Sequence, residues 1–262
     1  ACANGVTAGL TVRQTFLLTS TIWITLPLFG AIPFIIGATN CDFTDAYFEA
    51  MSGLTTTGST VLGGLEALPE GIKLWRGTLQ WLGGIGIIVV AMVFLPELRV
   101  GGMQIFRSES FETMGKILPR AAQIASRISV IYVGLTLACA LTYNALGMPT
   151  FDALVHAMTT LSTGGMANTD SSFGIYGAGI HYVGAFFMFS AALPFVRYVQ
   201  LLGGSAKPLL RDSQVRTFFW IIMVCVLMIT AWVWGREGQV TEIAFREALF
   251  NVVSIISGTG YA

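Results

Sequence analysis

Three short stretches rich in glycine, serine and threonine stand out in the sequence, because the backbone carbonyls and hydroxyls of such stretches can bind a cation. They read Met51-Ser-Gly-Leu-Thr-Thr-Thr-Gly-Ser59, Met158-Thr-Thr-Leu-Ser-Thr-Gly-Gly-Met166 and Val253-Ser-Ile-Ile-Ser-Gly-Thr-Gly-Tyr261. The glycines Gly58, Gly165 and Gly260 lie about 100 residues apart, which is too far for a solenoid repeat and fits a unit of two membrane helices and a loop. We expect three copies of one re-entrant loop.

The residue types in these stretches favour binding of a cation by backbone carbonyl oxygens. Glycine reaches dihedral angles that are closed to other residues, so it can turn successive carbonyl oxygens toward one axis. Serine and threonine hydroxyls add oxygens, and no carboxylate lies within the three loops to recruit a divalent ion. An all-oxygen cage of this kind suits a hard, singly charged, weakly hydrated cation. The predicted ion-binding residues are Thr56, Thr57, Gly58, Thr163, Gly164, Gly165, Gly258, Thr259 and Gly260.

The composition predicts that the loops lie in an integral membrane protein. Of the 262 residues, 54% are hydrophobic and 11% are charged, and the mean hydropathy is +0.73. A water-soluble globule of this composition would expose too much apolar surface, so we expect membrane lipid around the chain. The 14 basic and 14 acidic residues cancel and no basic cluster occurs, so a nucleic-acid partner is not expected.

Uncharged intervals locate the helices that would cross the membrane, since a spanning helix needs roughly 20 apolar residues. Five intervals qualify, and they lie between Arg13 and Asp42, Arg76 and Glu97, Arg127 and Asp152, Asp170 and Arg197, and Arg216 and Arg236. Three further apolar runs are too short to span: Ala46–Thr56, Ala153–Ser162 and Ala248–Ile256. Each short run carries one copy of the repeated pattern at its end.

The order of these segments predicts an all-α membrane fold built from repeated helix–pore-loop–helix units with incomplete fourfold pseudosymmetry. The first unit with its cytoplasmic linker would occupy residues 1–120, the second residues 121–214, and the incomplete third residues 215–262. Because the third unit lacks a closing helix, we expect the chain to be part of something longer, truncated after the third loop.

The basic residues predict the orientation in the membrane. With Arg13 inside, most lysines and arginines fall on the inner side, as the positive-inside rule requires. Loops 99–127 and 197–216 would then be cytoplasmic, and segments 40–72, 148–176 and 236–262 would face outward or enter the membrane from outside. Loop 99–127 also mixes charged and apolar residues. This pattern fits an amphipathic helix on the membrane surface, a docking face for a cytosolic subunit, or a solvated linker.

The short helices would then carry their negative ends into the membrane. Each begins near an outer acidic or hydroxyl residue that could cap the first turn. Their last carbonyls would present partial negative charge at mid-membrane, which favours a cation over an anion. The expected capping residues are Asp42, Thr44 and Asp45; Thr150 and Asp152; and Thr241 and Glu242.

At these residues the sequence resembles the TrkH/KtrB family of bacterial potassium uptake proteins. The resemblance covers essentially the whole chain, and its details are more like TrkH than KtrB. The segments Thr55–Thr60, Ser162–Met166 and Ser257–Tyr261 fall where the first three filter segments of that family would fall. One glycine per loop also matches the family. By analogy, a fourth filter, the closing helix of the third unit and an arginine in a last helix would follow Ala262.

The resemblance implies potassium uptake across a bacterial inner membrane, with K⁺ as the transported ion at the nine residues named above and no covalent cofactor. It also implies a homodimeric core and a cytosolic, nucleotide-binding regulatory subunit similar to TrkA. The alternative is a membrane scaffold or enzyme component in which the repeated loops only pack. No nucleophile–base–acid set stands out in the sequence, so an enzyme is not expected.

Several other residues are expected to have structural roles. His156 and His181 have no second histidine or cysteine at ligand spacing, so structure is favoured over metal binding. The four cysteines form no close pair, and a disulfide framework is not expected. The small residues of Gly83–Gly86 predict close helix packing. Kinks or helix breaks are expected at Pro27, Pro33 and Pro194.

Overall fold

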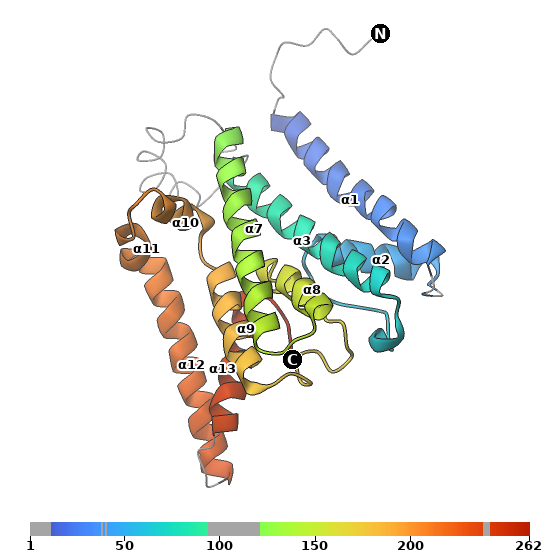
Figure 1. Cartoon of the computed structure of the whole chain (residues 1–262). Coiled ribbons are helices and arrows are strands. Elements are labelled where there is room, and N and C mark those ends of the chain that lie inside the picture. Colours follow the sequence, from blue (N-terminus) through green and yellow to red (C-terminus); the bar gives the residue numbers. More distant parts are fainter. Residues whose placement is uncertain (1–11, 38, 40, 94–120, 238–241) are drawn as a thin grey trace, which may run out of the picture.

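The computed structural model describes residues 12–37, 39, 41–93, 121–237 and 242–262, and these residues form helices joined by turns and loops (Figure 1). Most of the predicted loop 99–127, together with Cys2 and Thr241, lies outside these ranges. The elements are α1 (Val12–Ile36), α2 (Phe43–Leu54), the short 3₁₀ helix η1 (Leu65–Ala67), α3 (Glu70–Val93), α7 (Ala121–Ala145), α8 (Thr150–Leu161), α9 (Ala178–Ala191), α10 (Phe195–Leu202), α11 (Lys207–Arg211), α12 (Ser213–Glu237) and α13 (Glu242–Ser257).

Three helical stretches in the described ranges are long and apolar enough to cross a membrane, and they coincide with three of the five predicted spans. These stretches are Phe16–Ile36 in α1, Ala125–Ala145 in α7 and Ser213–Arg236 in α12. Helix α3 occupies the second predicted span but is not among them. Its N-terminal half carries Arg76 and Gln80, and both of these side chains are buried inside the protein.

The fourth predicted span is divided into two helices, α9 and α10. Helix α9 has 14 residues and stops at Ala191, and α10 begins at Phe195 after a bend of 91°. Pro194 precedes α10, and a proline cannot donate the backbone hydrogen bond that would continue α9. The break expected at Pro194 is therefore present. By contrast, α1 runs without interruption through Pro27 and Pro33.

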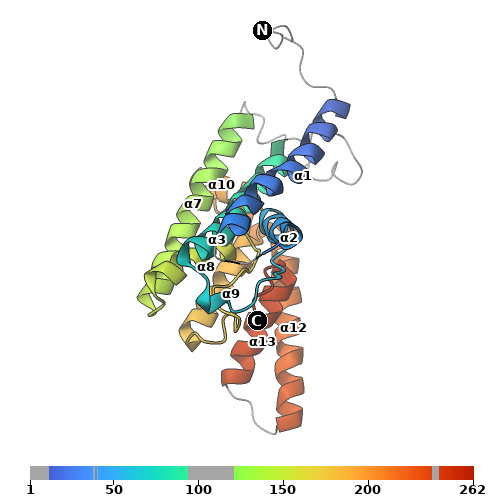
Figure 2. The same ribbon diagram turned by 90° about the vertical axis from the view of Figure 1, so that its right-hand side faces the viewer.

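The three predicted short helices are α2, α8 and α13, and each leads directly into one copy of the repeated pattern. Helices α2 and α8 have 12 residues each. Helix α13 has 16 residues and begins at Glu242, so the prediction of about ten residues for it was wrong. The last residues of the chain lie in the middle of the molecule, near α8 and α9 (Figures 1 and 2).

The predicted capping holds for the first short helix and fails for the second. Asp42 accepts a hydrogen bond from the backbone N–H of Asp45 at 2.8 Å. In α8 the residue before the helix is Pro149, which has no side-chain cap. The side chains expected to cap α8 bind elsewhere, because Thr150 accepts from Asn144 at 3.0 Å and Asp152 accepts from Asn168 at 2.7 Å.

Two apolar cores hold these helices together. The smaller lies between α1, α2 and α3 and includes Ala31, Phe34 and Leu79. The larger joins α7, α8, α9, α12 and α13 and also contains the Tyr261 side chain. Helix α3 connects the two cores because it packs against α8 and α7 as well as α2 (Figure 2).

Close packing at Gly83 and Gly84 confirms the predicted role of the small residues in α3, while Gly86 has no neighbour within 4 Å among the described residues. A Cβ atom at Gly83 would overlap the Leu54 carbonyl, and one at Gly84 would lie 2.8 Å from both Ser162 and Tyr132. These approaches bring α3 against the C-terminal ends of both α2 and α8. Helix α3 therefore packs against the chain at the start of the first two copies of the loop.

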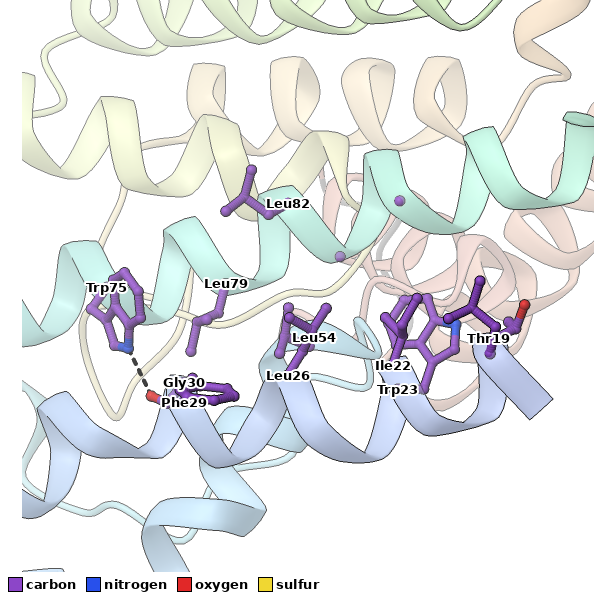
Figure 3. Close-up of a pocket in the computed structure, with 13 residues that line it drawn as sticks. Thr19, Ile22, Trp23, Leu26, Phe29, Gly30, Leu54, Trp75, Leu79 and Leu82 are labelled. Carbon is purple, nitrogen blue, oxygen red and sulfur yellow. Dashed lines mark hydrogen bonds between the residues drawn. The ribbon is translucent and has the colours of Figure 1, made fainter. Parts of the chain in front are cut away.

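An apolar groove of about 420 Å³ lies between α1 and α3 (Figure 3). Leu26 and Phe29 of α1 face Leu79 and Leu82 of α3 across it, and Leu54 at the end of α2 contributes to its wall. At one end the Trp75 indole N–H donates to the Gly30 carbonyl at 2.9 Å. This bond and the α2 contacts fix α1 onto the unit that carries the first loop.

The outer faces of α1 and α12 expose large apolar side chains, as expected for helices that face lipid. Helix α12 is exposed along most of its length, and its three tryptophans Trp220, Trp232 and Trp234 are all more than half exposed. Such a surface would be unfavourable in water. The exposed apolar residues of α12 are Phe219, Trp220, Ile221, Val224, Leu227, Met228, Ile229, Trp232 and Trp234.

Candidate ion site

The three copies of the repeated pattern share one hydrogen-bond arrangement. We call residues 55–60 the first loop, 162–166 the second loop and 257–261 the third loop. In each, one carbonyl near the end of the short helix accepts from two successive backbone N–H groups in the loop. Ser52 accepts from Thr57 and Gly58, Thr159 from Gly164 and Gly165, and Ser254 from Thr259 and Gly260, at 2.9–3.5 Å. The chain therefore folds back over the end of the helix in the same way three times.

The backbone dihedral angles repeat as well. Two residues in each loop, separated by one residue, have positive φ: Thr56 and Gly58, Thr163 and Gly165, and Gly258 and Gly260. This confirms the backbone geometry expected at Gly58, Gly165 and Gly260. Alternation between left-handed and other conformations turns successive carbonyls toward one side, whereas an extended strand would point them to opposite sides. The loops thus have the backbone needed for a row of carbonyl oxygens.

Positive φ at two threonines was not predicted. Thr56 has φ +55° and Thr163 has φ +52°, a region that β-branched residues rarely enter. Such conformations persist only where the surroundings hold them, and they concentrate at functional sites. The signal in the sequence was the alignment of the three copies, because Gly258 occupies the equivalent position in the third loop.

The three loops contact one another in order. A Cβ atom at Gly58 would overlap the carbonyl oxygen of Gly164, and one at Gly165 would overlap the carbonyl oxygen of Thr259. These are equivalent positions, so each loop lies against the next in the same relation. Gly260 has no neighbour within 4 Å in the part of the chain that the structure describes. All nine predicted site residues therefore fall in one contiguous arrangement.

The hydroxyls of Thr57 and Thr259 have partners within their own loops. The Thr57 and Thr55 hydroxyls lie 2.8 Å apart, and the Thr259 and Ser257 hydroxyls lie 2.7 Å apart. In the second loop, where glycine replaces the threonine, the Thr163 hydroxyl donates to the Ser162 carbonyl at 2.8 Å. These bonds orient the side chains locally and leave the backbone carbonyls as the feature shared by all three loops.

A buried ion pair behind the loops was missed in the sequence. Glu49 of α2 is fully buried and accepts from the Nε of Arg76 in α3 at 2.7 Å. Glu49 also accepts from the Thr60 hydroxyl, and Arg76 also donates to the Ala167 carbonyl. The sequence feature that could have revealed the pair is the carboxylate inside the short apolar run of α2. A carboxylate at membrane depth needs a partner.

Gln80 of α3 fills the space between the first two loops. Its Oε1 accepts from the Met166 backbone N–H at 3.1 Å, and its Nε2 is buried with no hydrogen-bond partner among the residues that the structure describes. A Cβ atom at Gly164 would overlap this side chain. Glycine at position 164 is therefore required by the packing against Gln80.

Tyr261 connects the second and third loops. Its hydroxyl lies 2.5 Å from the Thr159 hydroxyl and donates to the His156 carbonyl at 3.2 Å. Its ring is tilted against that of Phe173, with the ring centroids 4.3 Å apart. His156 is fully buried in the same aromatic cluster, and its Nδ1 lies 2.8 Å from the Asp152 carbonyl. These contacts agree with the structural role expected for this histidine.

Comparison with known proteins places the arrangement in a family. The family model TrkH, described as a cation transport protein, matches residues 6–261. The Trk system potassium uptake protein TrkI of Halomonas elongata is 45% identical over 251 residues, which is 95% of this chain and 51% of that protein. The Trk system potassium uptake protein TrkH of Escherichia coli is 38% identical over 95% of this chain and 53% of its own length.

A solved structure shows the same fold. The crystal structure of the potassium transporter TrkH from Vibrio parahaemolyticus superposes with a TM-score of 0.84 at 35% sequence identity, covering 95% of this chain and 52% of that one. The chain thus spans about half the length of the relatives it matches. These matches confirm the predicted all-helical membrane fold and the resemblance noted in the sequence. The chain belongs to the TrkH family of cation transport proteins.

Proposed function

We propose that this chain is part of a protein that takes up potassium across a membrane, and that its three loops line the path of the ion. The observation that carries the proposal is the threefold repetition of one backbone geometry in loops that touch one another at equivalent residues. Carbonyl oxygens held in this way can replace the water shell of a K⁺ ion. The proposed ligands are the backbones of the nine residues from Thr56 to Gly260 named in the sequence analysis.

The short helices add a favourable potential. The C-terminal ends of α2, α8 and α13 lead directly into the loops, so their partial negative charges lie beside the proposed ion path. The Glu49 carboxylate does not contribute a ligand, because it is buried and already accepts from three donors, the Thr60 hydroxyl, the Val61 N–H and Arg76. Neutral oxygens therefore surround the path, which suits a monovalent cation that must also leave.

The proposal includes an orientation and partners. The segment 197–216 carries the exposed Lys207, Arg211 and Arg216, and basic loops stay on the cytoplasmic side. We place loops 99–127 and 197–216 in the cytoplasm of a bacterium, with the protein in its inner membrane. The units 1–120, 121–214 and 215–262 are the proposed repeats. A homodimer and a TrkA-like regulatory subunit are the proposed assembly, on the strength of the family resemblance alone.

The test uses the full-length protein in a bacterial strain that lacks potassium uptake systems. We expect the protein to restore growth at low external potassium and to take up rubidium as a potassium substitute, with weak competition by sodium. Gly165→Ala should make uptake more sensitive to sodium, because the added Cβ overlaps the Thr259 carbonyl. A protein that reaches the membrane and gives no uptake would contradict the proposed function and favour a scaffold.

A further inference from the structure

We propose that the buried ion pair between Glu49 and Arg76 positions the first and second loops relative to each other, and that this positioning helps to set the preference for potassium over sodium. The inference rests on the proposed function, since it concerns the selectivity of the same path. It assigns a role to two charged residues that lie outside the nine proposed ligands.

Glu49 fixes the exit of the first loop. Its carboxylate accepts from the Thr60 hydroxyl at 2.9 and 3.0 Å and from the Val61 N–H at 3.2 Å. Thr60 ends the first loop and Val61 follows it. Because Glu49 projects from α2, the carboxylate ties the segment after the loop to the helix that precedes the loop. The first loop is therefore held at both of its ends.

Arg76 joins this anchor to the second loop. Its Nε donates to Glu49 at 2.7 Å, and its NH1 donates to the Ala167 carbonyl at 2.9 Å. Ala167 directly follows the second loop. A guanidinium group is planar and rigid, so two bonds from one group fix the separation of their acceptors. The exit of the first loop and the exit of the second loop are thus set by one side chain.

The position of the ion pair explains why its geometry should affect the selectivity of the path for K⁺ over Na⁺. Both side chains are almost completely buried, at 0% and 2% exposure, so the interaction is little screened by solvent. The two loops that it joins also touch where Gly58 lies against the Gly164 carbonyl. A shift at the exits would change the spacing of the carbonyls, and that spacing is one source of discrimination between K⁺ and Na⁺.

The second and third loops are joined differently. Besides the backbone contact of Gly165 with Thr259, the neutral hydroxyl of Tyr261 in the third loop bonds to Thr159 in α8, the helix before the second loop. The charged anchor therefore belongs to the first pair of loops alone among the described residues. This difference allows a change at Arg76 to be separated from a general weakening of the site.

The test is Arg76→Lys in the full-length protein, measured as rubidium uptake in the presence of increasing sodium. Lysine keeps the positive charge but cannot form the two fixed bonds of the guanidinium. We expect the preference for rubidium over sodium to fall about tenfold, because one charge-assisted hydrogen bond changes an equilibrium by about that factor. A fall caused by lost charge is excluded, since the charge is retained.

The matched control is Arg197→Lys. Arg197 pairs with Asp212 at 2.6 Å, and both side chains are mostly buried, but neither contacts a loop. We expect this variant to leave the sodium competition unchanged. An equal fall in both variants would overturn the proposal, because it would show a general effect of weakening a buried ion pair.

A second variant covers the case in which Arg76→Lys does not reach the membrane. Thr60→Val removes one bond to Glu49 from an exposed residue and leaves both charges in place. We expect it to reduce the preference for rubidium in the same direction and by less. Unchanged sodium competition in every variant that reaches the membrane would overturn the positioning role. Absence of uptake by the unmodified protein would instead contradict the proposed function.

Discussion

A side chain at Gly58 would occupy the position of the Gly164 carbonyl oxygen, so the backbones of the first and second loops touch at these residues. The same relation joins Gly165 to Thr259. Close contact between backbones leaves little room for a loop to move without moving its neighbour. The selectivity of the proposed path should therefore depend on glycine at these positions more than on the hydroxyl groups of the loops.

The first prediction concerns Gly58→Ala. The added Cβ disfavours the φ of +80° by roughly 1–2 kcal/mol and overlaps the second loop. A change of 1.4 kcal/mol in relative binding is about tenfold, so we expect about a tenfold loss of preference for rubidium over sodium. Uptake is measured against sodium competition, with the amount of protein checked by immunoblot.

The control for this substitution is Gly147→Ala. Gly147 has φ +95° and no neighbour within 4 Å, and it lies in the turn between α7 and α8, away from the loops. The backbone strain is comparable but nothing at the site is displaced. Equal changes in sodium competition from the two variants would mean that the effect of Gly58→Ala comes from general strain.

The second prediction separates backbone from side-chain ligands. The Thr57 hydroxyl is hydrogen-bonded to the Thr55 hydroxyl, while the backbone N–H of Thr57 donates to the Ser52 carbonyl. Thr57→Val removes only the hydroxyl and keeps the shape of the side chain. We expect a smaller change in sodium competition than in Gly58→Ala. Equal losses in the two variants would show that the hydroxyl oxygen is a main ligand.

Much of this site could be predicted because its determinants are local. The glycine positions, the hydroxyl residues and the short apolar helices before them repeat within each copy, so three copies reinforce one interpretation. The positive φ at Gly58, Gly165 and Gly260 follows from the same pattern. The bounds of the helices could not be predicted in the same way, because the length of an apolar run does not show that α13 begins at Glu242 or that α9 stops at Ala191.

The support behind the loops could not be predicted in the same way. Glu49 and Arg76 lie on different helices, and charge counting assigned Arg76 to the membrane surface. Only the packing of α3 against α2 and α8 shows that Arg76 is buried and faces Glu49. Gln80 likewise acquires its role from the Met166 N–H in a distant segment. Such pairs depend on tertiary contacts that no spacing along one helix reveals.

The third prediction concerns orientation. We expect a cysteine introduced as Ser171→Cys to react with an impermeant thiol reagent in cells whose inner membrane is intact, and Ser205→Cys not to react. Both serines are exposed, one in the segment between α8 and α9 and the other between α10 and α11. The native cysteines are first replaced, since Cys41 would lie on the outer side. Labelling of position 205 but not 171 would reverse the topology.

The last prediction tests the link between the second and third loops through Tyr261→Phe. The ring contacts with Phe173 remain, and only the hydroxyl bonded to Thr159 and to the His156 carbonyl is lost. Thr159 keeps its own bonds to the Val155 and His156 carbonyls, so no buried hydroxyl is left without a partner. We therefore expect a net loss of about 1 kcal/mol in the free energy of unfolding and a several-fold rise in competition by sodium.

The control for Tyr261→Phe is Tyr182→Phe, which removes a hydroxyl that donates to the exposed Glu242 at 2.9 Å. An exposed bond of this kind exchanges readily with water, so its loss should change neither quantity measurably. Thermal unfolding of the purified full-length protein and rubidium uptake with sodium give the two readouts. If Tyr261→Phe lowered the unfolding temperature while sodium competition stayed at the level of the unmodified protein, the hydroxyl would stabilise the fold without positioning the third loop for the ion.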